Sequence, residues 1–279
     1  MLNNLIDCHT HSKNSPDAID SVDAMCEQAI KLGLSAYAIT DHVECCLDRW
    51  KFEHDDEKIK PLYFKDIFEG SMSEISTAKE KYKGKLNLLC GLELGEPYQD
   101  LENADFYIND KRLDFVIASI HQIRKHEDFY FLDYNNYDIQ KLMTQYFEEI
   151  FEMCQWGKFD VVGHLTYTLR YMEGEQGHMV DMKPYQEIIR ECFKVLAHKG
   201  KGIEINTSGL RQKFGDSFPS LEYVKMFKEC GGEILTVGSD SHCVADLGKG
   251  ISQAYEIAKN AGFRYVTYFK DRKPNFIKL

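Results

Sequence analysis

Residues Asp7 to Asp17 read DCHTHSKNSPD and follow the apolar stretch LNNLI at positions 2–6. The pattern predicts a buried strand that ends in two histidines one residue apart, followed by a carboxylate six positions later. Side chains at i and i+2 of an extended segment point the same way, so His9 and His11 can bind one ion from two directions. Neutral imidazole is a good ligand for divalent metals. The segment therefore predicts a metal site where the first strand ends.

The rest of the chain alternates apolar runs with helical patterns. Helices are predicted at residues 21–33, about 61–82 and about 139–155, and the runs FVIAS (115–119) and ILTV (234–237) lack alternation, as is typical of strands buried in a parallel sheet. This alternation of apolar runs and helical patterns continues to the last apolar run, residues 264–269. Seven or eight such units predict an α/β barrel, with a doubly wound open sheet as the alternative. We expect one domain over residues 1–279, because no linker or low-complexity segment divides the chain.

Composition narrows the class of protein. The chain has 279 residues, a net charge of −11 and nine cysteines. We expect a cytoplasmic protein with reduced thiols and no membrane partner, because no signal peptide, long apolar segment or C-x-x-C pair is present. The acidic balance argues against a nucleic-acid partner, since such binding depends on Lys and Arg.

Ionisable side chains follow most of the predicted strands. In a barrel the carboxyl ends of the strands form one face, so residues more than 200 positions apart would meet there. A shared set of divalent metals explains such crowding best, and one carboxylate such as Glu93 can bridge two ions about 3.5–4 Å apart. The candidate ligands are His9, His11, His42, Glu93, His121, His164, Asp240 and His242.

In this order the motifs resemble the PHP (polymerase and histidinol phosphatase) superfamily. They are H-x-H, a residue six positions later, D-H, a glutamate, two isolated histidines and a closing D-x-H. The segments EINTSGLR (204–211), GSDSH (238–242) and YVTYFKDRKPNFIKL (265–279) look like the histidinol-phosphate phosphatase branch. The resemblance implies a distorted (β/α)7 TIM-like barrel and a phosphatase that converts L-histidinol phosphate to L-histidinol and phosphate in histidine biosynthesis.

The resemblance also implies three metal positions, occupied by two to three divalent ions of zinc, manganese or iron. One would be held by His9, His11, Glu93 and Asp240, a second by Glu93, His121 and His164, and a third by Asp17, His42 and His242. Some members have histidine where Asp17 stands, so we expect a third site that is weaker or that holds a different metal. Asp17 and His242 are also alternative candidates for catalytic proton transfer.

The expected chemistry is attack of a metal-bridging hydroxide on a small-molecule phosphate monoester. Phosphate favours a planar donor fork, which arginine supplies and lysine does not. Arg170, six residues beyond His164, is the first candidate to bind the substrate phosphate, and Arg211 is the second.

Two other functions stay open at this point. One is a PHP-type phosphodiesterase or exonuclease acting on nucleic acid or nucleotides, which would need a basic groove. The other is a noncatalytic binding protein with a vestigial metal site, which the completeness of the ligand set disfavours.

Overall fold

The structure is a computed structural model that describes residues 4–45 and 61–279. Its main sheet is entirely parallel, with the strand order β1-β2-β4-β5-β6-β7-β8 and with β3 beside β4. The strands are β1 (Ile6–Asp7), β2 (Ala36–Ile39), β3 (His42–Glu44), β4 (Leu88–Gly95), β5 (Phe115–Ser119), β6 (Val161–Val162), β7 (Gly202–Asn206) and β8 (Leu235–Gly238).

The first and last strands of this sheet meet. Cys8 N–H donates to the Val237 carbonyl at 2.9 Å, and Thr10 forms a parallel bridge with Ser241. These contacts nearly close the sheet into a barrel of seven parallel strands, with the short β3 as an addition beside β4. The prediction of a distorted (β/α)7 barrel is confirmed, and the open-sheet alternative is wrong.

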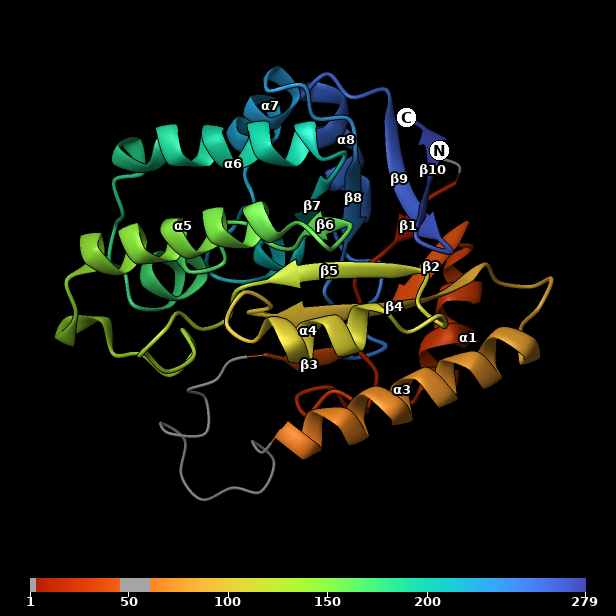
Figure 1. Ribbon diagram of the computed structural model, residues 1–279. Helices are drawn as coiled ribbons and strands as arrows, with labels where there is room; N and C mark the ends of the chain where they lie inside the picture. The colour runs from red at the N-terminus through yellow and green to blue at the C-terminus, as the bar shows by residue number, and fades with distance from the viewer. Residues whose placement is uncertain (1–3, 46–60) are drawn as a thin grey trace.

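Helices surround the barrel (Figure 1). They are α1 (Val22–Leu32), α3 (Pro61–Lys81), α4 (Leu101–Ile108), α5 (Ile139–Trp156), α6 (Gln186–His198), α7 (Leu221–Glu229) and α8 (Ile251–Asn260). Short helical turns are η2 (Tyr134–Asn136), η3 (Arg170–Glu175), η4 (Lys183–Tyr185) and η5 (Ser208–Arg211). The predicted caps of α1 are present: the Ser21 side chain accepts from Ala24 N–H, and Gly33 ends the helix at φ +69°.

The last strand-like run does not join the barrel. Strand β9 (Tyr265–Lys270) pairs with β10 (Lys273–Lys278) in a separate antiparallel hairpin. The hairpin turn covers the amino-terminal ends of β5 and β6: Asp271 N–H donates to Asp114 at 2.9 Å, and Arg272 Nε donates to Asp160 at 2.7 Å. The expectation of a further barrel unit at residues 264–269 is therefore wrong.

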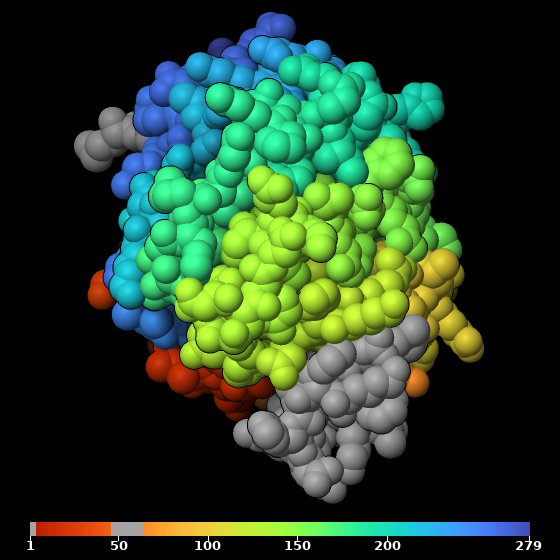
Figure 2. Space-filling model, turned by 90° about the vertical axis from the view of Figure 1, so that its left-hand side faces the viewer, coloured from red at the N-terminus to blue at the C-terminus, as the bar shows by residue number. Residues whose placement is uncertain are grey.

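The carboxyl ends of the strands form one face of the molecule. Figure 2 shows the face toward which β5 points in Figure 1, and segments from both halves of the sequence meet on it, from red near the N-terminus to blue near the C-terminus. All eight residues of β4 are buried, which explains its apolar pattern without alternation. Among the described residues, no helix combines the length and apolar character needed to cross a membrane.

Candidate metal centre

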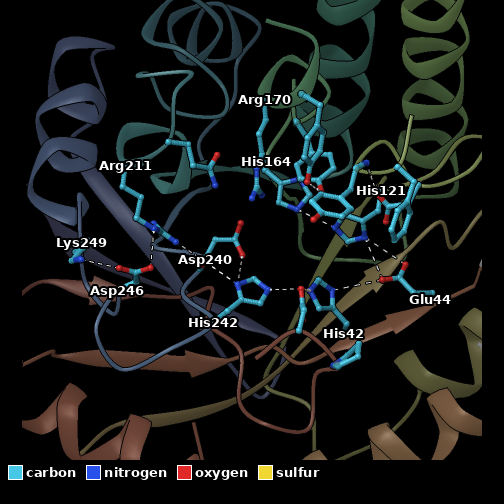
Figure 3. A pocket seen from close by; sticks show the side chains of 18 of the residues that line it. His42, Glu44, His121, His164, Arg170, Arg211, Asp240, His242, Asp246 and Lys249 are labelled. Carbon is cyan, nitrogen blue, oxygen red and sulfur yellow. Dashed lines mark hydrogen bonds and ion pairs between the residues drawn. The ribbon is translucent and has the colours of Figure 1, made fainter. Parts of the chain in front are cut away.

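The predicted ligands converge on a cavity of about 790 Å³ at the carboxyl ends of the strands. In Figure 3, His42, His121, His164, Asp240 and His242 surround its floor. Glu93, His9 and His11 lie beneath them and are fully buried. The topology therefore brings together residues of β3 and β4 with residues that directly follow β1, β5, β6 and β8.

Glu93 stands at the centre of the group. Its Oε2 lies 3.0 Å from His9 Nε2 and 3.0 Å from His42 Nδ1. Its Oε1 lies 2.7 Å from His164 Nε2 and 3.3 Å from His121 Nε2. Oε2 also lies 3.4 Å from His11 Nε2. The two carboxylate oxygens therefore face different sets of histidines, as a carboxylate that bridges two ions would require.

Strand pairing explains how His42 reaches Glu93. Strand β2 pairs with the first part of β4. The strand is interrupted at Thr40 and Asp41, and β3 then pairs with the later part of β4, which places His42 beside Glu93. The Asp41 carboxylate turns away from the centre and accepts hydrogen bonds from Ser12, Ser15 and Ser71. It thereby anchors the loop that follows the two histidines of the first strand.

Asp240 completes the inner part of the site. Its Oδ1 lies 3.3 Å from His11 Nε2 and 3.7 Å from His9 Nε2, and its Oδ2 accepts from Asn206 Nδ2 at 3.2 Å. Ligand atoms of His9, His11 and Asp240 all lie within 4.8 Å of one another, as do those of His9, Glu93 and His164. Such spacing allows one ion to be shared within each group.

The third predicted group lies nearer to solvent. Asp17 Oδ2 is 3.0 Å from His242 Nε2 and 3.8 Å from His42 Nε2, and 56% of the Asp17 side chain is exposed. The ring of His11 stacks on both His42 and His242 with centroids 4.2 Å apart, and these three histidines form another group within 4.8 Å. His11 thus joins the inner and the outer parts of the site.

The donor set fits divalent ions. Several buried ligand atoms that face the centre make no hydrogen bond of normal geometry among the described residues, although each lies about 3.0 to 3.3 Å from another atom of the group. Imidazole nitrogens and carboxylate oxygens that crowd together without such hydrogen bonds are favourable ligands for a shared cation. These atoms are His9 Nε2, His11 Nε2, His42 Nδ1, Glu93 Oε2 and His242 Nε2.

The pKa values follow from the same crowding. Burial raises the pKa of Glu93, but His9, His42 and His121 outweigh it and hold the value well below the usual range. Burial lowers the pKa of His9, yet Glu204, Glu93 and Asp240 raise it well above normal. Burial and the neighbouring His42 and His242 lower the pKa of His11 to about 3. The centre therefore keeps ionised carboxylates, which attract cations.

Sequence analysis missed two carboxylates that hold the predicted ligands. Glu204 Oε1 lies 2.8 Å from His9 Nδ1, and Glu44 Oε1 lies 3.3 Å from His121 Nδ1. Each leaves Nε2 of its histidine facing the centre, as partners of metal-binding histidines do. A Cβ at Gly238 would overlap Glu204 and His9, so glycine makes room for this pair. The EINTSG segment contains Glu204, but nothing local in it indicates a contact with residue 9.

The two candidate arginines line the same cavity but make different contacts. Arg170 lies at the start of η3 with its guanidinium over the Tyr171 ring, 5.1 Å from the centroid (Figure 3). Arg211 donates to the carbonyl oxygens of Ser239 and Asp240 at 2.6 and 2.7 Å. The guanidinium of Arg211 therefore already binds the backbone at Ser239 and Asp240.

Comparison with known proteins identifies relatives along nearly the whole chain. The PHP domain model matches residues 7–208. A histidinol-phosphatase of Lactococcus lactis subsp. lactis is 28% identical over 273 residues, covering 96% of this chain and 95% of the relative. A probable histidinol-phosphatase of Thermotoga maritima is 26% identical and covers 94% of each chain.

A solved structure gives the same result for the fold. The crystal structure of histidinol phosphate phosphatase from Lactococcus lactis, complexed with zinc, L-histidinol and phosphate, superposes with a TM-score of 0.77 at 26% identity, covering 98% of this chain and 100% of that one. Its zinc, L-histidinol and phosphate are properties of that protein. Since the domain model matches well over half of the residues, this chain belongs to the PHP domain family.

Proposed function

We propose that this chain is a metal-dependent histidinol-phosphatase, which hydrolyses L-histidinol phosphate to L-histidinol and phosphate. The observation that carries the proposal is the position of Glu93, whose two oxygens face different sets of histidines beneath the floor of the cavity. The relatives named histidinol-phosphatase support the choice of substrate. We place the reaction in histidine biosynthesis, and the cytoplasmic location stays a prediction.

The ligand assignment is part of the proposal. His9, His11, Glu93 and Asp240 would hold one ion, Glu93, His121 and His164 a second, and Asp17, His42 and His242 a third. Two to three ions of zinc, manganese or iron suit these nitrogen and oxygen donors. Divalent ions bound there would supply positive charge beside the phosphate and lower the pKa of water.

The chain's own residues would orient the substrate. Arg170 is the side chain we propose to clamp the phosphate, because its guanidinium borders the cavity and can form a two-point contact with phosphate oxygens. The second predicted phosphate ligand, Arg211, stays a prediction. Asp17 Oδ2 and His242 Nε2, 3.0 Å apart, are the alternative donors of the proton that the leaving alkoxide needs. Because a metal ion and a proton compete for the same lone pairs, an atom would donate that proton only while it does not bind the third ion.

The wall of the cavity near η3 suits a cationic, partly aromatic leaving group. Asp128 is buried there and accepts from Tyr130 N–H at 2.9 Å. Tyr167 and Tyr171, whose hydroxyls lie 2.7 Å apart, border the cavity beside it. A carboxylate can pair with the ammonium of histidinol, and aromatic rings can stack on its imidazole. The sequence also predicts that the segments near residues 43–60 and 96–112 cover the site, and of these, residues 46–60 lie outside the described residues.

We also propose that residues 1–279 act as one catalytic domain. The hairpin β9–β10 supports this, because Arg272 binds Asp160 directly before β6 and so ties the C-terminal segment to the barrel.

The test measures substrate preference and metal content on one preparation. Purified protein with quantified metals should show its highest kcat/KM on L-histidinol phosphate, lower values on p-nitrophenyl phosphate, and the lowest on bis(p-nitrophenyl) phosphate and single-stranded DNA. A higher kcat/KM on a diester or DNA would replace the proposal with the phosphodiesterase alternative. Protein that binds metal but cleaves none of these esters would contradict both enzymatic functions.

A further inference from the structure

The Ser239–Asp240 turn carries a proposed metal ligand in an uncommon backbone conformation. Asp240 has φ +52°, a left-handed value that few residues other than glycine adopt. Such a conformation persists only where neighbouring groups enforce it. The turn follows β8 directly, and its conformation decides where the Asp240 carboxylate lies.

Arg211 contacts this turn with both ends of its guanidinium. Nη1 donates to the Ser239 carbonyl at 2.6 Å, and Nη2 donates to the Asp240 carbonyl at 2.7 Å. The two carbonyls belong to consecutive residues, so the planar fork fixes both peptide groups at once. Figure 3 shows Arg211 reaching toward the chain beside Asp240.

A second set of contacts holds Arg211 itself. Asp246 Oδ2 lies 3.5 Å from Arg211 Nε, and Lys249 Nζ donates to Asp246 Oδ1 at 2.8 Å. The guanidinium therefore has acceptors on three sides, two on the turn and one behind it. The Asp240 side chain is meanwhile steered by Asn206 Nδ2, 3.2 Å from Oδ2, which leaves Oδ1 facing His9 and His11.

We infer that Arg211 is a positioning residue that fixes the Ser239–Asp240 turn and so keeps the Asp240 carboxylate in place to share a divalent ion with His9 and His11. The inference rests on the proposed metal centre. It assigns Arg211 an effect on ion affinity, whereas the predicted role as a second phosphate ligand would affect substrate affinity alone. Each terminal nitrogen keeps one N–H beyond those given to the turn, so measurement has to separate the two roles.

The experiment measures divalent-ion affinity without substrate. Metal-free wild type, Arg211→Ala and Arg170→Ala are titrated with Co²⁺ and Zn²⁺ against a chromophoric chelator, and the visible spectrum of bound Co²⁺ is recorded. Arg211→Ala should lose affinity at one site by about 10–100-fold, as is typical when a partner of a metal ligand is removed, and its Co²⁺ spectrum should change. Arg170→Ala, which lacks an arginine from the same cavity, should keep both the affinity and the spectrum of the wild type.

Chemical rescue separates positioning from a general loss of structure. Added ethylguanidinium should restore ion affinity to Arg211→Ala and should leave that of Arg170→Ala unchanged. Lack of rescue would mean that the loss is general, and would overturn the inference. If Arg211→Ala does not fold, Arg211→Lys decides, because one ammonium can contact only part of the turn: reduced affinity supports the inference and wild-type affinity overturns it.

Two further outcomes discriminate between the proposals. Wild-type ion affinity in Arg211→Ala, together with a raised KM for the phosphate ester, would overturn the inference alone and make Arg211 a phosphate ligand. Failure of the wild type to bind either ion would overturn the proposed metal-dependent function, and this inference with it.

Discussion

The two ends of the barrel bury carboxylates beside different partners. At the amino-terminal end, Asp160 pairs with Arg272 at 2.7 Å and Asp114 pairs with Lys79 at 2.6 Å. At the carboxyl end, the ion pairs formed by Glu93 and Asp240 within the described residues are with histidines. The buried carboxylates at one end face permanent cations of the chain, whereas Glu93 and Asp240 face imidazoles, which can share protons or bind added cations. The comparison separates carboxylates that stabilise the fold from carboxylates that prepare a site for ligands.

The pKa values show the same difference. Burial raises the pKa of Asp160, and Arg272 only partly offsets that effect. Burial also raises the pKa of Asp240, but His9, His11 and His242 outweigh it and hold the value well below normal. The carboxylate of Asp240 therefore stays ionised despite its burial, and the groups that keep it so are imidazoles, which can also bind metal ions.

The largest expected effect is at Glu93. Glu93→Gln keeps the side-chain shape but removes a charge and a good ligand atom, so kcat/KM should fall by more than about 100-fold, beyond the 10–100-fold cost of losing a mere partner of a ligand. Elemental analysis should show that metal content falls with the rate. The exposed Glu102→Gln on α4 is the control and should change neither. Full metal occupancy with near-normal activity would remove Glu93 from the site.

A substitution at the amino-terminal end of the barrel should lower the stability of the protein and leave its catalytic activity unchanged. Arg272→Met leaves the Asp160 carboxylate buried without its cation, which should lower the free energy of unfolding by about 3 kcal/mol at neutral pH. The metal content and the kcat/KM of the folded protein should stay at wild-type values, and Lys273→Met in the same hairpin is the control. Denaturant unfolding measures the effect.

The pH dependence of that deficit follows from the raised pKa of Asp160. Without Arg272 the folded-state pKa rises further above the unfolded value, so the folded variant binds a proton more tightly than the unfolded chain does. The stability lost in the variant should therefore shrink as the pH falls through the folded-state pKa. A deficit that grows on acidification would show that the ion pair does not cause it.

Arg170→Met should have an intermediate effect on kinetics. A charge-assisted hydrogen bond contributes roughly 1.5–3 kcal/mol, which corresponds to about ten- to more than a hundredfold in kcat/KM. Arg170→Lys should recover only part, since it loses the planar fork, while metal content stays unchanged in both. Arg264→Met, an exposed arginine, serves as the control. Wild-type kcat/KM in Arg170→Met would leave Arg211 as the leading phosphate ligand.

The smallest effect is expected at Asp17, on the exposed edge of the carboxyl end. Asp17→Asn should lower kcat/KM about tenfold or less, because the outer site is expected to be the weaker one and His242 remains as the alternative proton donor. At most one equivalent of metal should be lost. A fall as large as that of Glu93→Gln would show that the outer group is as essential as the inner one.

The sequence predicted the barrel and the convergence of eight ligand candidates because these lie at or near the ends of strands whose apolar pattern is plain, whereas Asp17 was implied only by the resemblance to the family. His42 and Glu93, for example, come together through ordinary parallel pairing of β3 with β4. Their roles as ligands stay predictions, although the geometry brings their atoms within reach of shared ions.

Other features had no local signal. Glu204 contacts His9 across 195 positions, and a glutamate inside a buried strand has no pattern that identifies its partner. The hairpin turn at Asp271 and Arg272 has φ values of +50° and +59°, which a two-residue hairpin usually reaches with Asn-Gly or Asp-Gly. Because neither position is glycine, the sequence contains no hairpin signal here. The apolar pattern of β9 alone therefore predicted another strand of the barrel.

The seam between Thr10 and Ser241 gives the site a role in the topology of the chain. His9 and His11 lie on one side of this seam, and Asp240 and His242 lie on the other, so an ion held by both sides ties the first strand to the last. Because an ion would bind the folded site and not the unfolded chain, such a tie would raise the free energy of unfolding by the free energy of ion binding, about 2.7 kcal/mol at an ion concentration 100-fold above Kd. Ion binding would then stabilise the closed barrel, so the ligands proposed for the chemistry would also contribute to the stability of the fold.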